Sequence, residues 1–262
     1  GNVVSLVNKF LKAGVLVENE FEETMVGTPQ GGPLSPLLSN VILNKLDKEL
    51  EARGLNFVRY ADDIIILVKS EKAANRVMAS ITDYIERKLG LKVNMTKTKV
   101  CKPNELKYLG FGFYKHSKYE VIPHKESKVK FKRKLKGLTK RSESISLDKR
   151  FEKLNWLIRG WVNYFKISKM KTFLKLVDEW LRTRIRMIIW KMWKLPKTRA
   201  LNLMRCGLNK DEATRTAYSR KGYYALARTF QLGSTISKLR LSKPNKTKER
   251  RGLVFALDYY LA

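Results

Sequence analysis

Apolar and polar residues alternate with two different periods along the first 120 positions. A period near 3.6 predicts amphipathic helices, at residues 3–14, 35–53 and 71–89. Shorter apolar runs predict strands, at 15–26 as a hairpin or two short strands, 56–68 as a hairpin, 91–94 as one short strand, and 107–122 as a further hairpin. The second of these helices is expected to bury Leu38, Val41, Ile42, Leu46 and Leu50. The pattern predicts an α+β module with helices on one face of a mixed sheet.

The pattern changes after Pro123. Residues 125–141 contain nine Lys or Arg and one Glu. Helical spacing then returns at 147–165 and 172–193, which predicts a small helical domain. Farther along, an Asn and a Glu with the spacing of an N-cap and N3 pair predict one more helix at 209–217.

Charge is distributed unevenly between the two halves. The chain holds 55 Lys and Arg against 24 Asp and Glu, a net charge of +31. Residues 1–120 contain 18 basic and 14 acidic side chains, whereas residues 121–262 contain 37 and 10. This excess predicts a polyanionic partner that the second half grips.

The lengths of the apolar runs and the number of cysteines limit the class of protein to which the chain can belong. The longest apolar runs, residues 64–68 and 187–190, are far shorter than the roughly 20 residues that span a bilayer. We therefore expect no membrane partner. The two cysteines, Cys101 and Cys206, form neither a zinc pattern nor a disulfide framework. They suit a reducing compartment such as the cytoplasm.

Two adjacent carboxylates, Asp62 and Asp63, interrupt the hairpin at 56–68. Consecutive strand side chains point to opposite faces, so both carboxylates can act at one centre only where the chain turns. Hard divalent cations, above all Mg²⁺, prefer oxygen ligands, and two ions about 4 Å apart can hold the attacking and leaving oxygens of a phosphoryl transfer. A plain surface turn, where Asp is common, explains the pair about as well.

A Gly/Pro-rich stretch at 27–36, GTPQGGPLSP, predicts a sharp loop ahead of a helix. Backbone N–H groups at a helix start attract phosphate, and a glutamine beside glycines can approach a base pair closely. The Gly-Lys-Ser/Thr ending of a phosphate-binding loop is missing. By itself the stretch predicts no more than a loop.

Taken in order, these segments resemble the motifs of reverse transcriptases. GTPQGGPLSPLLSNVILNKLDKEL resembles motif B, FVRYADDIIILV motif C, GLKVNMTKTKV motif D and KYLGFGF the primer-grip strand. LNWLIRGWVNYFKI resembles the maturase-specific domain of group II intron proteins, most nearly the compact bacterial type without an endonuclease domain. The resemblance implies a partial right-hand polymerase palm at 1–122, an α-helical thumb or maturase domain at 123–195, and a small basic region like a DNA-binding region at 196–262.

The resemblance also implies roles for single residues. Asp62 and Asp63 would bind Mg²⁺, and Lys97 would approach the nucleotide phosphates as a third catalytic residue. Nucleotide and template contacts are implied for Pro29, Gln30, Gly31, Tyr60 and Ala61, and primer-grip contacts for Leu109 and Gly110.

One departure from the family pattern concerns the metal site. Family members carry a further catalytic Asp in motif A, upstream of motif B, whereas the 26 residues before Gly27 contain no Asp. We therefore expect the fingers and motif A to be absent from this chain. The two-ion Mg²⁺ site is expected to be incomplete, and the chain alone to polymerise slowly or not at all.

The function implied is RNA-directed DNA polymerisation together with maturase activity. The expected partners are an RNA template, a DNA primer, dNTPs, the group II intron RNA and target DNA, and a homodimer stays open. Two other interpretations remain. The missing Asp favours a non-enzymatic RNA-binding splicing maturase, and the intact YADD at 60–63 counts against it. The GWVNYF signature at 160–165 argues against a retron-type reverse transcriptase.

Basic side chains of the second half are expected to contact RNA. A-form duplexes are recognised through backbone and shape, and neutralised phosphates make such binding sensitive to salt. The residues expected there are Lys128, Lys132, Arg133, Lys134, Lys136 and Arg159. Trp161 and Phe165 are expected in the helical core, and the basic segment 238–251 as a DNA-contacting loop or a disordered arm.

Overall fold

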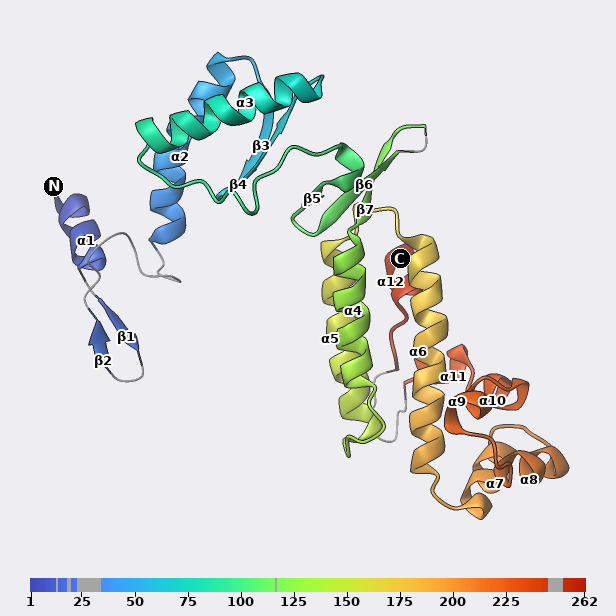
Figure 1. The fold of residues 1–262 in the computed structure, drawn as a ribbon. Coiled ribbons are helices and arrows are strands. Elements are labelled where there is room, and N and C mark those ends of the chain that lie inside the picture. Colours follow the sequence, from blue (N-terminus) through green and yellow to red (C-terminus); the bar gives the residue numbers. More distant parts are fainter. Residues whose placement is uncertain (13, 18–19, 23–33, 116, 245–251) are drawn as a thin grey trace. The chain divides into compact units, whose positions relative to one another are not determined.

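The chain forms two compact units, Gly1–Cys101 and Lys102–Ala262 (Figure 1). The computed structural model describes residues 1–12, 14–17, 20–22, 34–115, 117–244 and 252–262. Within these ranges, no helix is both long enough and apolar enough to cross a membrane.

Among its described residues, the first unit contains three α-helices, one π-helical turn and two small hairpins. It begins with α1 (Asn2–Leu11) and the antiparallel strands β1 (Val15–Val17) and β2 (Glu20–Glu22). It continues with α2 (Ser35–Ala52), the antiparallel strands β3 (Asn56–Tyr60) and β4 (Asp63–Leu67), and α3 (Glu71–Asp83), which a π-helical turn extends over Tyr84–Lys88.

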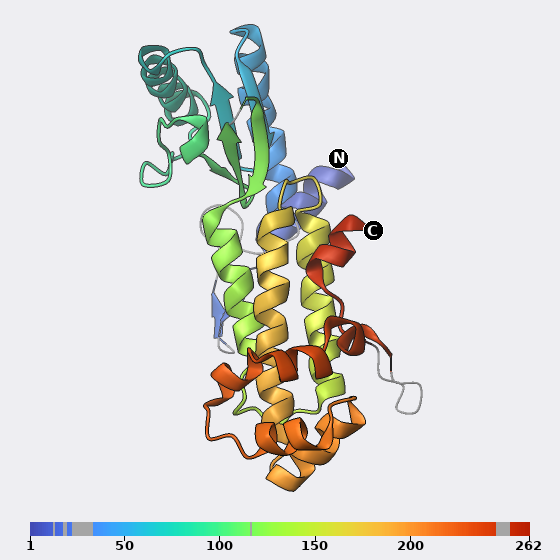
Figure 2. The same cartoon turned by 90° about the vertical axis from the view of Figure 1, so that its right-hand side faces the viewer.

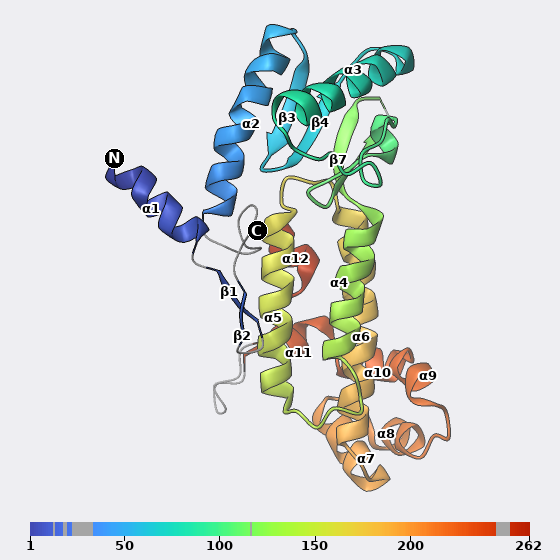
Figure 3. The same cartoon turned by 60° about the vertical axis from the view of Figure 1, so that its left-hand side comes forward.

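Helices α2 and α3 pack on one face of the β3–β4 hairpin (Figure 3). Phe57 pairs with Ile66 and Arg59 with Ile64, so these four side chains share a face. Their apolar members join a core with Leu43, Leu46 and Leu50 of α2 and Ile81 of α3. The opposite face of the hairpin carries the exposed side chains of Val58 and Tyr60. The predicted hairpin, with helices on one face, is confirmed.

The predicted mixed sheet is wrong. The described residues form three separate antiparallel sheets, of two, two and three strands. Parallel pairs need long crossover connections, whereas only two or three residues separate the paired strands along the chain here. The strand predicted at 91–94 is also wrong: the side chain of Asn94 accepts hydrogen bonds from Lys97 N–H and Thr96 Oγ1 and so favours a turn instead.

The second unit begins with a short sheet. A 3₁₀ turn (Pro103–Glu105) precedes β5 (Lys107–Tyr108), β6 (Phe111–Lys115) and β7 (Tyr119–Pro123), which pair antiparallel in that order. The hairpin predicted at 107–122 is thus confirmed, with one extra strand. This sheet shares a compact unit with the helices that follow, while the boundaries expected at 122 and 195 stay predictions.

Helices make up the rest of the second unit (Figure 2). They are α4 (Lys125–Leu138), α5 (Leu147–Tyr164), α6 (Lys171–Met192), α7 (Pro196–Arg205), α8 (Lys210–Ala217), α9 (Tyr223–Ala227), α10 (Phe230–Thr235), α11 (Lys238–Ser242) and α12 (Ala256–Leu261). The N-cap predicted for α8 is confirmed, because the side chain of Asn209 accepts a hydrogen bond from Glu212 N–H at 2.8 Å.

The three long helices α4, α5 and α6 lie side by side around one apolar core. Trp161 stacks on Phe131 with ring centroids 4.3 Å apart, and Phe165 is 5% exposed. Both aromatic side chains therefore belong to the core, as expected. Helices α7 to α10 build a smaller core around Trp190 and Leu203.

Residues 252–257 bind the long helices α5 and α6 through two buried side chains. Buried Asn155 on α5 accepts a hydrogen bond from Val254 N–H and donates one to the carbonyl of Gly252, each within 2.9 Å. Buried Asp178 on α6 accepts hydrogen bonds from Ala256 N–H and Leu257 N–H, both at 2.8 Å. Burial raises the pKa of the Asp178 carboxyl, and the two amide bonds counteract that rise.

Candidate metal and nucleic-acid site

The acidic pair lies at a tight turn. Tyr60 pairs with Asp63, which leaves Ala61 and Asp62 as a two-residue connection between β3 and β4. Both carboxylates are exposed, and Asp63 begins β4 on the face that the helices leave uncovered. Ala61 has φ of 52°, a left-handed conformation that costs a residue with a Cβ about 1–2 kcal/mol.

The side chain of Arg59 joins this turn to helix α2. Its Nη1 donates hydrogen bonds to the carbonyl of Ala61 and to Oδ1 of Asn40, both at 2.8 Å. Its Nε donates to Oδ1 of Asp47 at 2.7 Å, and its Nη2 binds the other oxygen of the same carboxylate. The side chains of Arg59 and Asp47 are only 13% and 22% exposed. Sequence analysis missed this network, although a lone Arg on the buried face of a strand is a signal for it.

The acidic pair fits part of a Mg²⁺ ligand set. Mg²⁺ is usually held by one or two carboxylates, with water and substrate phosphates completing its octahedron. The exposed turn presents two carboxylates from adjacent positions. Within the described residues, no group of three or more His, Cys, Asp or Glu side chains could hold a metal ion.

The other expected nucleotide-binding residues fall in different settings. Pro29, Gln30 and Gly31 lie outside the described residues. Tyr60 is 64% exposed beside the acidic turn. Lys97 is exposed on the turn that Asn94 stabilises.

The expected primer-grip residues form a second two-residue turn. Leu109 and Gly110 connect β5 to β6, with φ of 49° and 81°. Tyr164 Oη donates a hydrogen bond to the carbonyl of Leu109 at 2.8 Å. Ser127 Oγ and His124 N–H donate to the carbonyl of Gly110, at 2.8 and 2.9 Å. The helical domain thus fixes the backbone of this turn.

Most of the predicted RNA-binding side chains are exposed on α4. Lys132, Arg133, Lys134 and Lys136 all face solvent. Lys128 is half-buried with its ammonium 5.5 Å from the centre of the Phe173 ring, and burial lowers its pKa. Lys132 approaches the same ring at 5.8 Å.

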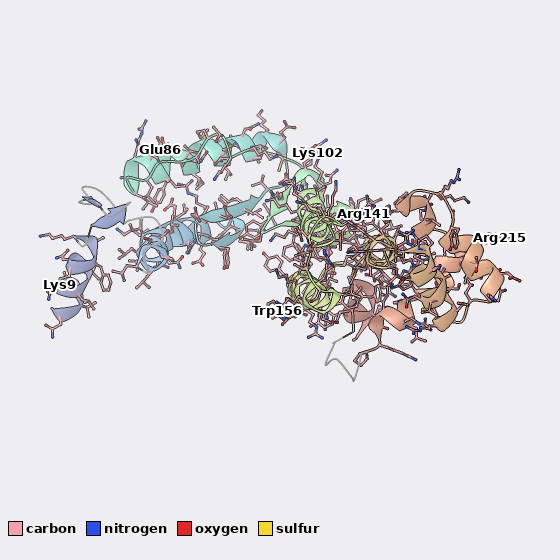
Figure 4. All side chains as sticks on the ribbon, turned by 90° about the horizontal axis from the view of Figure 1, so that it is seen from below. Lys9, Glu86, Lys102, Arg141, Trp156 and Arg215 are labelled. Carbon is pink, nitrogen blue, oxygen red and sulfur yellow. The ribbon has the colours of Figure 1, made fainter. Side chains whose placement is uncertain are left out.

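Arg159 lies on α5 beside two aromatic side chains. Its guanidinium is 5.9 Å from the centre of the Tyr259 ring. One helical turn earlier, Trp156 is 65% exposed and extends from the outer side of the bundle (Figure 4). Exposed aromatic and guanidinium groups of this kind can stack on bases.

A basic depression lies between the start of α6 and the C-terminus. Its volume is about 730 Å³. It is lined by the side chains of Lys128, Lys166, Lys169, Lys171, Phe173 and Tyr260, among others. Lys169 pairs with Glu120. The ammonium groups of Lys128, Lys166 and Lys171 beside an aromatic surface suit a phosphate backbone.

Two other arginines, Arg184 and Arg186, stabilise the helical domain through hydrogen bonds. Arg184 donates hydrogen bonds to Oγ1 and the carbonyl of Thr139. Arg186 donates to the carbonyls of Ala227, Gly233 and Ile236. Burial lowers the pKa of both guanidinium groups. Part of the basic excess is therefore structural, which net charge alone cannot reveal.

Comparison with known proteins identifies two family segments. Residues 3–113 match the family model described as "Reverse transcriptase (RNA-dependent DNA polymerase)". Residues 128–207 match the model described as "Group II intron, maturase-specific domain".

Three curated relatives share parts of the chain. Protein YkfC of Escherichia coli is 31% identical over 147 residues, 43% of this chain and 38% of YkfC. The group II intron-encoded protein LtrA of Lactococcus lactis is 47% identical over 60 residues, 23% of this chain and 10% of LtrA. The retron Ec86 reverse transcriptase of Escherichia coli is 37% identical over 79 residues, 29% of this chain and 24% of the enzyme.

A reverse transcriptase segment followed by a maturase-specific segment is the order of the two matches along this chain. The chain thus combines a segment of the reverse transcriptase family with a segment of the group II intron maturase-specific family, and part of it is similar to the group II intron-encoded protein LtrA. It covers between 10% and 38% of the length of the three relatives described.

Proposed function

We propose that this chain supplies the acidic turn, the primer grip and the nucleic-acid-gripping helices of a bacterial, cytoplasmic group II intron reverse transcriptase and maturase. Its expected partners are an RNA template with a DNA primer, dNTPs, its intron RNA and target DNA. The observation that carries the proposal is the union of an exposed two-carboxylate turn with a basic helical domain that matches the maturase-specific family.

Asp62 and Asp63 are the residues that would hold Mg²⁺, which supplies charge stabilisation for phosphoryl transfer when bound. Tyr60 and Ala61 lie beside that centre in the chain, and the Leu109–Gly110 turn holds the primer backbone. Lys97 approaches the nucleotide phosphates. Pro29, Gln30 and Gly31 contact the templating pair. Hydrogen bonds to backbone carbonyls of both turns support these roles, since positioning contributes strongly to catalysis.

The helical domain grips the polyanion through the exposed face of α4 and the basic depression beside α6. Lys132, Arg133, Lys134 and Lys136 contribute charges from one helix, and Lys128 and Arg159 add cation–aromatic pairs. RNA affinity should therefore fall steeply as salt rises.

Primer extension on an RNA template with Mg²⁺ tests the proposal. We would assay the chain alone, the chain preceded by the upstream segment of LtrA, and Asp62→Asn in each form. We expect little or no extension by the chain alone and extension once the upstream segment is present. Asp62→Asn should then reduce the rate at least about 100-fold, because a metal ligand is lost.

Asp83→Asn is the matched control. Asp83 is an exposed carboxylate in the same unit, paired with Arg87 on the helix surface, and its loss should leave extension unchanged. Equal rates for Asp62→Asn and Asp83→Asn would contradict the proposed metal site. RNA binding without extension in every form would support the splicing-only maturase.

A further inference from the structure

The acidic turn has an unusual residue at its first position. Two-residue hairpin turns often need positive φ there, and Gly or Asn meets this need best. This chain has Ala61 with φ of 52°. A residue with a Cβ persists in this conformation when its surroundings hold it there.

Helix α2 provides the restraint through Arg59. Asn40 and Asp47 lie seven residues apart, two turns along one face of the helix. At least four of the five N–H donors of Arg59 are engaged: one with Asn40, two with Asp47 and one with the carbonyl of Ala61. The guanidinium of Arg59 thus connects helix α2 to the carbonyl of Ala61.

The charges in the network of Arg59, Asp47 and Asn40 are also compatible with a cation site at the acidic pair. A lone guanidinium next to two carboxylates would compete with a metal ion for them. Here Asp47 binds the guanidinium with both oxygens, in a partly buried pair. Arg59 can therefore shape the turn while its charge is compensated.

We propose that Arg59, anchored by Asp47 and Asn40, is a positioning residue that sets the conformation of the Ala61–Asp62 turn and thereby the divalent-cation affinity of the acidic pair. This inference rests on the proposed metal-binding role of Asp62 and Asp63. It adds a requirement beyond that role: the carboxylates bind well only while the turn keeps its left-handed first residue.

Binding of Mn²⁺ alone, followed by its electron paramagnetic resonance signal, tests the inference on the chain as it stands. Mn²⁺ takes the same oxygen ligands as Mg²⁺. Arg59→Lys keeps the charge, but a single ammonium cannot bridge Asn40, Asp47 and Ala61 together. We expect the dissociation constant to rise about tenfold, the factor that corresponds to losing the restraint on one left-handed residue.

Arg53→Lys is the matched control. Arg53 also extends from the α2 region, but it binds Glu49 and Ser80 rather than the turn. We expect its substitution to change Mn²⁺ affinity less than twofold. Equal losses for Arg53→Lys and Arg59→Lys would overturn the inference.

A rescue variant separates positioning from general stability. Gly adopts positive φ without the steric penalty of a Cβ, so adding Ala61→Gly to Arg59→Lys should recover most of the lost affinity. A variant that has merely lost the fold of the hairpin would not be rescued in this way. Failure of Ala61→Gly to recover any affinity would overturn the inference.

Asp62→Asn distinguishes this inference from the function on which it rests. If Asp62→Asn weakens Mn²⁺ binding and Arg59→Lys does not, the inference is wrong and the metal site stands. If Asp62→Asn has no effect, the metal site itself is wrong, and the inference falls with it.

Discussion

Two turns in this molecule, Ala61–Asp62 and Leu109–Gly110, have the same length and begin with the same strained geometry. Their first residues, Ala61 and Leu109, have φ of 52° and 49°. Side chains fix the backbone carbonyls of both turns. The fixing groups differ: a guanidinium with a carboxylate counter-ion holds the first turn, whereas two hydroxyls and one backbone N–H hold the second.

The different binding groups suit the Ala61–Asp62 turn to ligand binding and the Leu109–Gly110 turn to a fixed backbone. Arg59 holds the first turn from the helix side, and both carboxylates are exposed. The second turn is part of an aromatic cluster, in which Phe111 lies 5.6 Å from Tyr164 and 4.9 Å from Phe165. Charge therefore governs the first turn and packing the second, so substitutions should affect them in different measurements.

Crowding the second turn should have the largest effect on stability. A Cβ added at Gly110 would lie 3.1 Å from Ser127 Oγ and 3.3 Å from Phe165 Cζ, at a φ of 81°. Gly110→Ala should therefore lower the free energy of unfolding of the second unit by about 2 kcal/mol. All five tryptophans lie between residues 156 and 193, so their fluorescence during urea unfolding reports on this unit.

Gly160→Ala is the control for that experiment. A Cβ at Gly160 meets nothing within 4 Å, and Gly160 lies inside α5, where Ala is favoured over Gly by about 1 kcal/mol. We expect this variant to be slightly more stable than the parent. A loss at Gly160 equal to that at Gly110 would contradict packing as the force that governs the second turn.

Removing one hydroxyl from the second turn should have a smaller effect. Tyr164→Phe deletes the donor to the Leu109 carbonyl but keeps the ring that stacks on Phe111. Because Tyr164 is 56% exposed, water can replace part of the bond, and we expect a loss of about 0.5 kcal/mol. Tyr218→Phe, at a tyrosine that is 57% exposed, is the control in the same urea titration. A loss as large as that of Gly110→Ala would show that the hydroxyl, rather than packing, dominates.

The position of the first turn could be predicted from sequence because its signals are local. Apolar alternation on both sides of Asp62 and Asp63 specifies a hairpin, and the two carboxylates can lie only at its tip. The start of α2 at Ser35 and the N-cap of α8 at Asn209 follow from similarly local signals.

The networks that hold the turns could not be predicted, since they join residues distant in sequence. Arg59 meets Asp47 only because α2 packs on β3, and Tyr164 meets Leu109 across 55 positions. The burial predicted for α2 was also partly wrong: Val41 and Ile42 are 63% and 39% exposed, whereas Leu43 is buried. Only a hairpin and one helix share its core in the described residues, so its buried stripe is narrower than its apolar pattern.

Acidification should weaken the second turn slightly, through the N-cap of α4. His124 Nδ1 accepts a hydrogen bond from Glu126 N–H at 3.3 Å, which requires that nitrogen to be unprotonated. Burial lowers the pKa of His124, and nearby charges modify it, in decreasing order those of Glu126, Lys107, Lys125 and Lys128. With a pKa below 6.5 in the folded state, the unfolded chain binds more protons, so stability falls as pH drops through 6.5 toward the folded value.

The pH effect can be isolated by substitution. The chain has only two histidines, His116 and His124, so urea midpoints between pH 7 and 5.5 would be compared for His116→Gln with and without His124→Asn. Asn is a good N-cap that does not titrate in this range, and we expect the second variant to lose the part of the pH dependence that His124 causes. The His124 cap lies at the start of α4, next to the Leu109–Gly110 turn. We therefore expect it to leave the Ala61–Asp62 turn unchanged, so that Mn²⁺ affinity at a fixed pH is equal in the two variants. A change in Mn²⁺ affinity with His124→Asn would break the separation between a turn governed by charge and a turn governed by packing.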